Sequence, residues 1–519
     1  MVKKIVAWFF ILVGVAALFF AGSALVLILA PGTEIFGIRY MNSGMSEYTY
    51  KDNISHFTGD IYIETEAVPI TVEYSVDASY YIYYCQNFVG FTRSEHEKAS
   101  LDANLITNEE TGKEDLVIKA NEMVKWLYAQ DLGADYEFKL RLPIQAVNKS
   151  LHIKSPSSSV KIDTTGLGNV AMKNFDVVSE GDFTLKGKIY ADTFKLHTNK
   201  TININDNIDC LDLDLKSSGG NINISKAIRN IKAETSVGDI KFLTCQNLDA
   251  KTGSGDVKSY NAGLTSVAGY AKIQTKSGFI ELGNVSFDTT LEAEKRKLEI
   301  KSNSGEINVS LANDVVITSE RGKVLIGEAN KLVINANVGS VVVKTVHESA
   351  IINGRNGSVT MGENGTIKNV EVVTTSGKID VQNTTGQVNL KSTSNAVTYK
   401  NLTSENITIH SAKDLNAHGL RGTVNIYTNG DANISFAQVS GDVNIETGGK
   451  TDNVNIDATC QDYSTVNYKI ESTKGAKAKV FAGESLLVEK TKIESTMVEG
   501  QKTINVKTSY AEVVLKLSA

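Results

Sequence analysis

The chain has 519 residues, of which 7% are aromatic, 41 are glycine and four are proline. This composition favours one long repetitive β structure over several unrelated globular domains. The formal net charge of −6 is spread along the chain without a basic block, so nucleic acid is excluded as an expected partner.

The N-terminal segment has the pattern of a membrane anchor. Lys3 and Lys4 precede an apolar run, residues 5–30, that contains no charge. About 26 residues at about 1.5 Å each can cross a bilayer core of about 30 Å. A cleaved signal peptide is the alternative, but the apolar run continues beyond the small residues 21–24, where cleavage would fall. We therefore predict an uncleaved transmembrane helix within residues 1–30.

The two lysines also predict the orientation of this helix. Positive charge is retained on the cytoplasmic side of membrane helices, and the next positive charge after Lys4 is Arg39. We expect a single-pass protein of the cell membrane, with a cytoplasmic N-terminus and residues 31–519 outside the cytoplasm. Residues 31–150 alternate apolar and polar positions in short runs such as 61–63, 70–72 and 136–142. That pattern predicts a near-membrane β region that forms the N-terminal cap and the first coils.

An internal repeat begins at about residue 151. Glycines that follow a Ser/Thr-rich stretch recur every 17 to 27 residues, with one wider gap, and most of the spacings are close to 18. A β-branched or aliphatic residue lies two positions after each glycine, and mostly apolar residues lie seven and five positions before it. The glycines are Gly220, Gly238, Gly255, Gly278, Gly305, Gly322, Gly339, Gly357, Gly377, Gly422 and Gly441.

This spacing predicts two short strands around a tight turn in each unit, with glycine supplying a backbone conformation that other residues avoid. A unit of about 18 residues cannot bury an apolar face alone, so the units must stack. The predicted fold is all-β, a right-handed parallel β-helix, or β-solenoid, because parallel crossovers are nearly always right-handed. Residues 151–483 would form the repeat array, and residues 484–519 the C-terminal coils and cap.

Two further positions of the repeat are expected to face outwards and to set the register. Six residues before the glycine, charges alternate in sign from unit to unit, as in Asp214, Lys232 and Asp249. Three residues before it, hydroxyl residues such as Thr235 and Thr252 recur and would form an exposed ladder. Such cross-strand pairs contribute about 0.2–1 kcal/mol each.

Short motifs shared with a known family accompany this repeat. The passage 57–64, the run 70–72 and the run 140–143 precede recurrent Ser-Gly-Asp/Glu/Lys-Ile/Val units at 254–257, 304–307, 376–379 and 440–443. Together they resemble the DUF4097 adhesin family of bacterial envelope proteins. The resemblance implies a β-helical, surface-facing and often anchored protein without established catalytic residues, sometimes encoded near envelope-stress systems. This chain differs by an insertion between Cys85 and Val117 and by its longer repeat array.

The sequence predicts no catalytic, cofactor or metal site. Its seven histidines are scattered without ligand-like spacing to one another or to cysteine. Asp212 and Asp214 share a strand face and resemble the carboxylate pair of a polysaccharide-active β-helix, but Lys232 and Glu234 in the next unit favour a structural charge ladder. Four separately placed, mostly buried thiols are expected for Cys85, Cys210, Cys245 and Cys460, although an oxidising compartment would permit disulfides.

An aromatic cluster near the anchor supplies the one candidate binding surface. Tyr80, Tyr81, Tyr83, Tyr84 and Trp126 could stack on sugars or rest against lipid headgroups. The structural alternative is that these rings cover the exposed first coil.

We therefore predict a non-enzymatic, membrane-anchored, adhesin-like β-solenoid that binds a glycan or a surface protein. An envelope-stress scaffold that contacts a membrane-protein partner is the second hypothesis. A β-helical polysaccharide-active enzyme is the third.

Overall fold

The computed structural model describes residues 2–29, 34–35, 38–39, 42–53, 56–65, 68–76, 79–90, 100–121, 136–144, 149–167, 170–227, 229–259, 265–285, 297–400, 404, 406–449, 453–460 and 463–518. It divides into two compact units, residues 1–232 and residues 233–519. The boundaries predicted from the sequence, at residues 30, 150 and 483, stay predictions.

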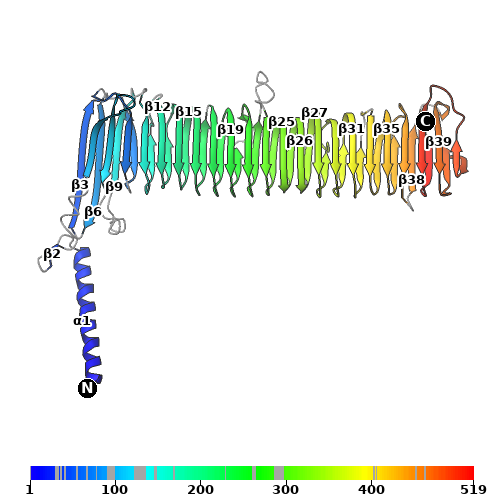
Figure 1. Cartoon of the computed structure of the whole chain (residues 1–519). Helices are drawn as coiled ribbons and strands as arrows, with labels where there is room; N and C mark the ends of the chain where they lie inside the picture. Colours follow the sequence, from blue (N-terminus) through cyan, green and yellow to red (C-terminus); the bar gives the residue numbers. More distant parts are fainter. Residues whose placement is uncertain are drawn as a thin grey trace. The chain divides into compact units, whose positions relative to one another are not determined.

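Helix α1 (Val2–Leu29), the one α-helix among the described residues, covers the predicted anchor (Figure 1). Within the described part of the chain, no helix is long and apolar enough to cross a membrane. The transmembrane assignment is therefore still a prediction.

The described part of the first unit, beyond α1, consists mainly of β-strands. Their bounds are β1 (Glu34–Ile35), β2 (Ile38–Arg39), β3 (Asn42–Asn53), β4 (Ile61–Thr65), β5 (Ile70–Ser75), β6 (Ser79–Gly90), β7 (Ser100–Thr107), β8 (Glu114–Asn121), β9 (Tyr136–Pro143), β10 (Leu151–Ser155), β11 (Val160–Asp163), β12 (Val170–Ser179), β13 (Phe183–Lys186), β14 (Ile189–Thr198), β15 (Ile202–Ser217) and β16 (Ile222–Ala227). Strand β17 (Asn230–Thr235) contains the boundary between the units.

Two parallel ladders form the coils of this unit. One ladder runs β8, β4, β10, β12, β14 and β15, and the other runs β9, β5, β11, β13, β15 and β16. At their first strands the pairing becomes antiparallel, because β7 lies on β8, while β6 and then β3 lie on β9. These antiparallel strands cover the edge of the first coil, as expected for an N-terminal cap.

The second unit repeats the same two-strand coil. Its strands are β18 (Ile240–Thr244), β19 (Asn247–Thr252), β20 (Val257–Ser259), β21 (Thr265–Val267), β22 (Ala271–Thr275), β23 (Ile280–Val285), β24 (Lys297–Ser302), β25 (Ile307–Arg321), β26 (Val324–Val338), β27 (Val341–Gly354), β28 (Val359–Met361), β29 (Ile367–Thr374), β30 (Ile379–Gln382), β31 (Thr384–Ser392), β32 (Val397–Lys400), β33 (Asn406–Ser411), β34 (Leu415–Leu420), β35 (Thr423–Thr428), β36 (Ala432–Phe436), β37 (Val443–Thr447), β38 (Asn453–Thr459), β39 (Val466–Ser472), β40 (Ala478–Ala482), β41 (Ser485–Lys490), β42 (Lys492–Glu494), β43 (Lys502–Thr508) and β44 (Glu512–Ser518), with a short 3₁₀ helix at Tyr463–Thr465.

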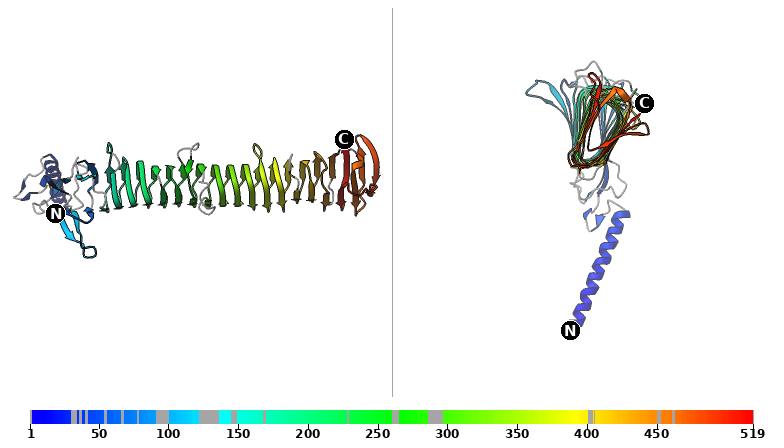
Figure 2. Two further views of the ribbon diagram at one scale, coloured as in Figure 1. Left: turned by 90° about the horizontal axis from the view of Figure 1, so that it is seen from above. Right: turned by 90° about the vertical axis from the view of Figure 1, so that its right-hand side faces the viewer.

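The registers of these strands confirm a parallel β-solenoid. Val324, Val341, Val359 and Ile379 stack in register, 17, 18 and 20 residues apart, and each is fully buried. Buried residues alternate with more exposed ones in strands such as β30 and β32, which places an apolar core between the two ladders. Figure 2 shows the strands in opposed layers when the coils are seen from their end. The right-handed sense of the coils stays a prediction.

The C-terminal coil lies out of sequence order. Strands β43 and β44 pair in parallel with β37 and β38 on one side and with β39 and β40 on the other. Figure 1 shows these red strands between β38 and β39. The chain therefore builds the β39–β40 layer first, returns through β41 and β42, and fills the remaining place with its last residues. Strands β41 and β42 lie antiparallel on β40 and β39, and the assignment of residues 484–519 as a C-terminal cap stays a prediction.

The aligned glycines lie where successive coils touch, as predicted, but mainly for a different reason. A Cβ atom on Gly255 would lie 1.9 Å from the carbonyl oxygen of Gly238, and one on Gly278 would lie 1.7 Å from that of Gly255. Only some aligned glycines, such as Gly322 with φ of 118°, also adopt a backbone conformation that favours glycine. Close backbone stacking therefore requires glycine throughout the series.

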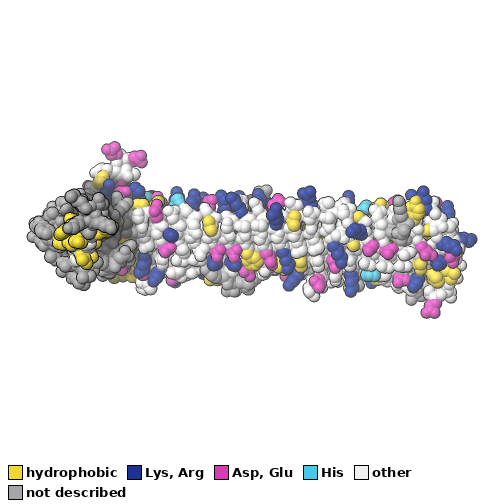
Figure 3. Space-filling view, turned by 90° about the horizontal axis from the view of Figure 1, so that it is seen from below, with side chains coloured by type: hydrophobic (Ala, Val, Ile, Leu, Met, Phe, Trp, Pro, Cys, Tyr) yellow, Lys and Arg dark blue, Asp and Glu magenta, His cyan; other side chains and the backbone are white. Residues whose placement is uncertain are grey.

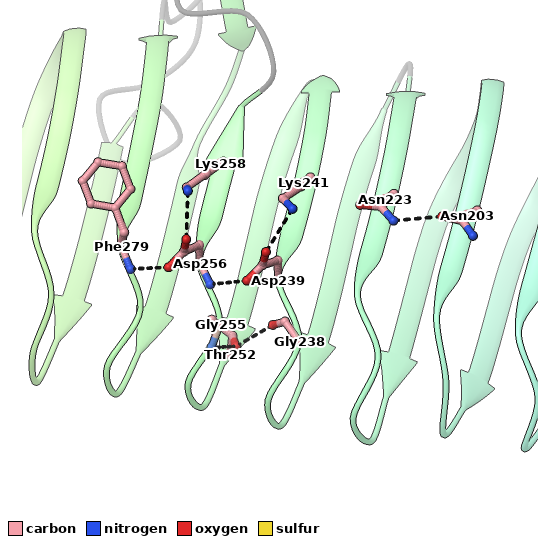
Figure 4. Close-up of polar contacts among 10 residues, drawn as sticks. All are labelled: Asn203, Asn223, Gly238, Asp239, Lys241, Thr252, Gly255, Asp256, Lys258 and Phe279. Carbon is pink, nitrogen blue, oxygen red and sulfur yellow. Dashed lines mark hydrogen bonds and ion pairs between the residues drawn. The ribbon is translucent and has the colours of Figure 1, made fainter.

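The predicted exposed hydroxyl ladder is wrong in its direction. Thr235, Thr252, Thr275 and Ser302 are at most 4% exposed, and they stack inside the corner of each coil. The prediction is wrong because alternate residues of a strand face the same side. The position three before the glycine therefore shares the inward face of the apolar positions seven and five before it. These hydroxyls instead form hydrogen bonds with backbone groups of the turns. Thr252 Oγ1 donates to the carbonyl of Gly238 at 3.0 Å and accepts from the amide of Gly255 at 3.0 Å (Figure 4).

The aspartate of each Gly-Asp motif links one coil to the next. Asp239 Oδ1 accepts the backbone amide of Asp256 at 2.9 Å, and Asp256 Oδ1 accepts that of Phe279 at 2.8 Å (Figure 4). Lys241 and Lys258 neutralise these carboxylates at 3.0 and 2.8 Å. Burial alone would raise the pKa of Asp239, but these hydrogen bonds and the lysines lower it. The motif that suggested the family thus has a structural role.

Candidate functional site: an amide-lined groove on the C-terminal coils

The structure separates the residues of the predicted aromatic surface. Tyr80 is 1% exposed and packs edge-on against Phe57 at 5.7 Å, so its ring belongs to the core of the cap. Tyr81 and Tyr83 are half-buried on the opposite face of β6, with Arg141 lying 5.9 Å from the Tyr81 ring. The side chain of Tyr84 and the whole of Trp126 lie outside the described residues.

A groove of about 640 Å³ lies on the first coils, close to the cap. Its floor contains Tyr62 and His152, whose rings stack at 4.5 Å with planes 7° apart. Its charges are already paired, because Glu64 contacts Lys154 at 2.8 Å and Lys119 at 3.7 Å. The hydrogen bond from Lys154 is the main cause of the lowered pKa of Glu64. This groove therefore offers an aromatic surface but little unpaired charge.

A second groove, of about 510 Å³, crosses the outer face of β33, β35, β37, β43 and β39. Asn425, Asn444 and Asn505 stack in register along its floor. Asn444 Nδ2 donates to Asn425 Oδ1 at 3.0 Å, and Asn505 Nδ2 donates to Asn444 Oδ1 at 3.1 Å. Asn444, the middle amide, still has one N–H and one oxygen lone pair outside this ladder. The amides follow one another at the coil spacing of about 4.8 Å. We call this site the amide groove.

An aromatic and charged row borders the amide groove. His410, Tyr427, Glu446, Lys507 and Glu471 follow one another on successive strands. Tyr427 Oη donates to Asn429 Oδ1 at 3.1 Å, which holds the half-buried ring with His410 5.8 Å away. Within the described part of the chain, the three charged members of this row form no ion pair closer than 4.0 Å. Both signs of charge are therefore available to a ligand.

The polar surface continues over the preceding coils. A further groove, of about 440 Å³, shares Asn425 with the amide groove. It is also lined by Thr423 and extends back to β27. Glu371, Asn389, Thr408 and Asn425 stack there in one row. The two grooves together form an outer face on which neutral hydrogen-bonding groups recur at every coil.

The carboxylates and thiols that a catalytic site would need can be followed in the described residues. No group of three or more His, Cys, Asp or Glu among them is placed to hold a metal ion. Asp214 pairs with Lys232 at 2.8 Å, as the charge-ladder interpretation predicts, and Asp212 is exposed. Burial raises the pKa of Cys210 to about 12, which disfavours its reactive thiolate.

The predicted separate thiols are confirmed where they can be seen. Cys210, Cys245 and Cys460 are buried and free of disulfides. The side chain of Cys85 lies outside the described residues.

Sequence reasoning missed the amide groove, although the repeat contains its signal. Asn425 and Asn444 each lie three residues after an aligned glycine, as do Asn223 and Asn308. That position has outward parity, so a recurrent asparagine there predicts an exposed amide ladder. Asn505 belongs to the coil inserted out of order and has no aligned glycine, so it could not be found in this way.

Comparison with known proteins agrees with the repeat. Residues 201–341 match the family model described as Toastrack DUF4097. This chain carries a Toastrack DUF4097 segment. The resemblance inferred from the Ser-Gly-Asp motifs is thereby confirmed over those residues. No curated protein sequence matches this chain.

Two solved structures match part of this chain at low similarity. One, from Clostridium sporogenes ATCC 15579, is described as a "putative cell adhesion protein"; it is 9% identical, with 52% of this chain and 100% of that chain covered and a TM-score of 0.24. The other, from Parabacteroides merdae ATCC 43184, is described as a "putative adhesin"; it is 13% identical, with 64% and 95% covered and a TM-score of 0.21.

Proposed function

We propose that this protein is a membrane-anchored, non-enzymatic, adhesin-like solenoid that binds an extended glycan of the cell envelope or of an extracellular surface through the amide groove. The observation that supports this most directly is the repetition of neutral donors and acceptors at the coil spacing, beside the half-buried ring of Tyr427. An amide can both donate to and accept from sugar hydroxyls, and an aromatic ring can pack against the apolar face of a sugar.

The charge of the groove narrows the ligand class. Glu446 and Glu471 are balanced by Lys469 and Lys507, so the lining has no net charge. A polyanion would find no cluster of positive charge there. A neutral or zwitterionic polymer fits this lining better.

The test is a glycan array probed with the full-length protein in detergent, with polymer cleavage monitored in the same wells. We expect retention without cleavage, weakened about tenfold or more by Tyr427→Ala or Asn444→Ala. Asn433→Ala is the matched control, because Asn416, Asn433 and Asn455 form the same kind of ladder on the other sheet. Cleavage of any glycan would contradict the non-enzymatic assignment, and equal losses in all variants would place binding elsewhere. Absence of all retention would favour the envelope-stress scaffold.

The anchor is a separate part of the proposal. We infer that residues 5–30 hold the chain in the cell membrane, with the N-terminus in the cytoplasm and residues 31–519 outside it. Trp8, Phe10 and Phe20 support this inference, since they are 68%, 67% and 76% exposed on α1 and would otherwise contact water. Carbonate extraction should leave the full chain in the membrane fraction and release a variant that lacks residues 5–30. Release of both would reject the anchor.

A further inference from the structure

The solenoid ends on an open strand edge. Among the described strands, β41 pairs only with β40, and β42 pairs only with β39, so one edge of each carries no further strand. Leu486 and Leu487 on β41 are 51% and 53% exposed. Figure 3 shows hydrophobic side chains at the surface near this end of the C-terminal coils. An exposed strand edge with apolar side chains is a site for pairing with another strand.

Strands β41 and β42 present the same face to the core on either side of the corner at Thr491, because the alternation of faces restarts at that corner. Val488 lies opposite the buried Val480, and Ile493 lies opposite the buried Ile470, so both face the core. Residues opposite one another in an antiparallel pair share a face. Glu489 and Lys492, next to them, therefore face outwards, and both are exposed.

This arrangement is self-complementary in one antiparallel register. When the segment is paired with a second copy so that Lys490 lies opposite Thr491, Val488 meets Ile493 and Glu489 meets Lys492. A twofold axis then generates each contact twice. Val488 and Ile493 are joined on the core face, Glu489 and Lys492 are joined on the outer face, and Lys490, which lies opposite Ala478 in its own chain, meets Thr491 at the corner. A register shifted by one residue would place outward residues against inward ones.

We propose that β41 and β42 are a docking surface for a second copy of this chain, which pairs through them antiparallel and edge to edge. The β41 strand of one copy extends the ladder of the β42 strand of its partner. Because the twofold contact uses both edges at once, it closes and leaves no edge for further growth. The irregularity at Leu487 and the nearby lysines disfavour open-ended stacking in other registers. This inference does not rest on the amide groove.

The occupant is a second copy rather than an unrelated peptide because the charges complement themselves. Glu489 already contacts Lys477 at 3.3 Å on its own chain, and that exposed pair leaves the carboxylate accessible to a further lysine. A foreign strand would gain the backbone hydrogen bonds but would need its own matching charges in both places.

Charge reversal tests the pairing. Sedimentation velocity of the detergent-solubilised full chain should show a concentration-dependent monomer–dimer equilibrium. Glu489→Lys and Lys492→Glu should each weaken the dimer about tenfold or more, since each puts like charges together twice. The double variant Glu489→Lys/Lys492→Glu should recover the wild-type dissociation constant.

The control and the contrary outcomes are equally specific. Glu484→Lys changes the same charge outside the paired segment and should leave the dissociation constant unchanged. A chain that stays monomeric at every concentration would overturn the proposal. A dimer that survives the single reversals unchanged would also overturn it, by placing the contact elsewhere, for example at α1. Retention of glycan by a monomeric variant would separate this inference from the proposed function.

Discussion

On the outer face of the first coils, Glu64 is held between Lys119 and Lys154, and His152 lies between Tyr62 and Asp176. On the outer face of the C-terminal coils, Glu446, Lys507 and Glu471 also follow one another in register, yet none of the three forms an ion pair within the described residues. The first region uses its charges to fix its own strands. On this face the second links its strands through neutral amides and leaves these three charges outside any described ion pair.

This difference separates stabilisation from recognition. Exposed ion pairs contribute about 0–1 kcal/mol each, so the first coils gain little from theirs, but the paired groups are no longer available to a ligand. An amide ladder stabilises the stack while each member keeps donors and acceptors outside the ladder. The C-terminal coils can therefore be rigid and still present an unsatisfied polar surface.

The largest predicted effect comes from removing the coil that completes the C-terminal region. Deleting residues 501–519 removes Asn505 and Lys507 from the amide groove, along with five buried side chains, Ile504, Val506, Val513, Leu515 and Leu517. Their burial is worth on the order of 10 kcal/mol, so β39–β42 should detach and the edges of β37 and β38 should open. Hydrogen exchange should show lost protection in β35–β42, with the first coils unchanged. A chain ending at Ser518 is the control, and undisturbed protection in the truncated chain would show that the inserted coil is dispensable.

The same glycine turn occurs in both regions, so Gly→Ala substitutions in it should lower the unfolding free energy equally in both. A Cβ on Gly181 or on Gly441 would lie 2.4 Å from a backbone carbon of the preceding coil, that of Ser158 or Gly422 respectively. Gly181→Ala and Gly441→Ala should each lower the unfolding free energy by about 1–3 kcal/mol, because the backbones must separate. Thermal and denaturant unfolding would measure both losses.

Gly219 supplies the control for this comparison. Its nearest neighbour to an added Cβ is 3.6 Å away, so Gly219→Ala should change stability by less than about 0.5 kcal/mol. A large loss in only one region would mean that the turns are not equivalent.

The fold was largely predictable because stacking imposes one rule on every coil. Val257, Ile307 and Val324 were expected inside from their place after a glycine, and all are buried. The same alternation places the side chain of Thr252 inside the coil, whereas the predicted hydroxyl ladder places it outside. The inserted coil could not be predicted, because a periodic sequence specifies which residues face inwards but not the order in which coils stack. Asn425 and Asn444 repeat at one outward position, whereas Asn505 joins them only through that insertion.

Acid should destabilise the first coils through Asp163. Burial alone would raise the pKa of Asp163, but hydrogen bonds from Thr165 and Lys161 hold it at about 2, below its ordinary value of 3.8. A depressed folded-state pKa contributes stability above pH 3.8 and loses it as the pH falls towards 2. The contribution is about 1 kcal/mol after solvent screening.

This contribution can be isolated with one substitution. Asp163→Asn should remove the pH dependence between pH 4 and pH 2 in β10–β13, measured as opening free energies by hydrogen exchange at stepped pH, with Asp212→Asn as the exposed control. An unchanged slope in Asp163→Asn would assign the acid sensitivity of this region to other groups.

The modest stability loss expected from breaking an amide ladder is the most informative about function. Asn444→Ala and Asn433→Ala each remove one member of an amide ladder, on opposite sheets of neighbouring coils. Because each loses two exposed hydrogen bonds, both should lower the unfolding free energy by about 0.5–1.5 kcal/mol, and by nearly equal amounts. Equal stability losses would show that the two ladders are structurally equivalent, so that any loss of ligand confined to Asn444→Ala must come from recognition. If Asn444→Ala instead proved far more destabilising than Asn433→Ala, weaker binding would reflect damage to the stack, and the contrast between paired and available polar groups would lose its functional meaning.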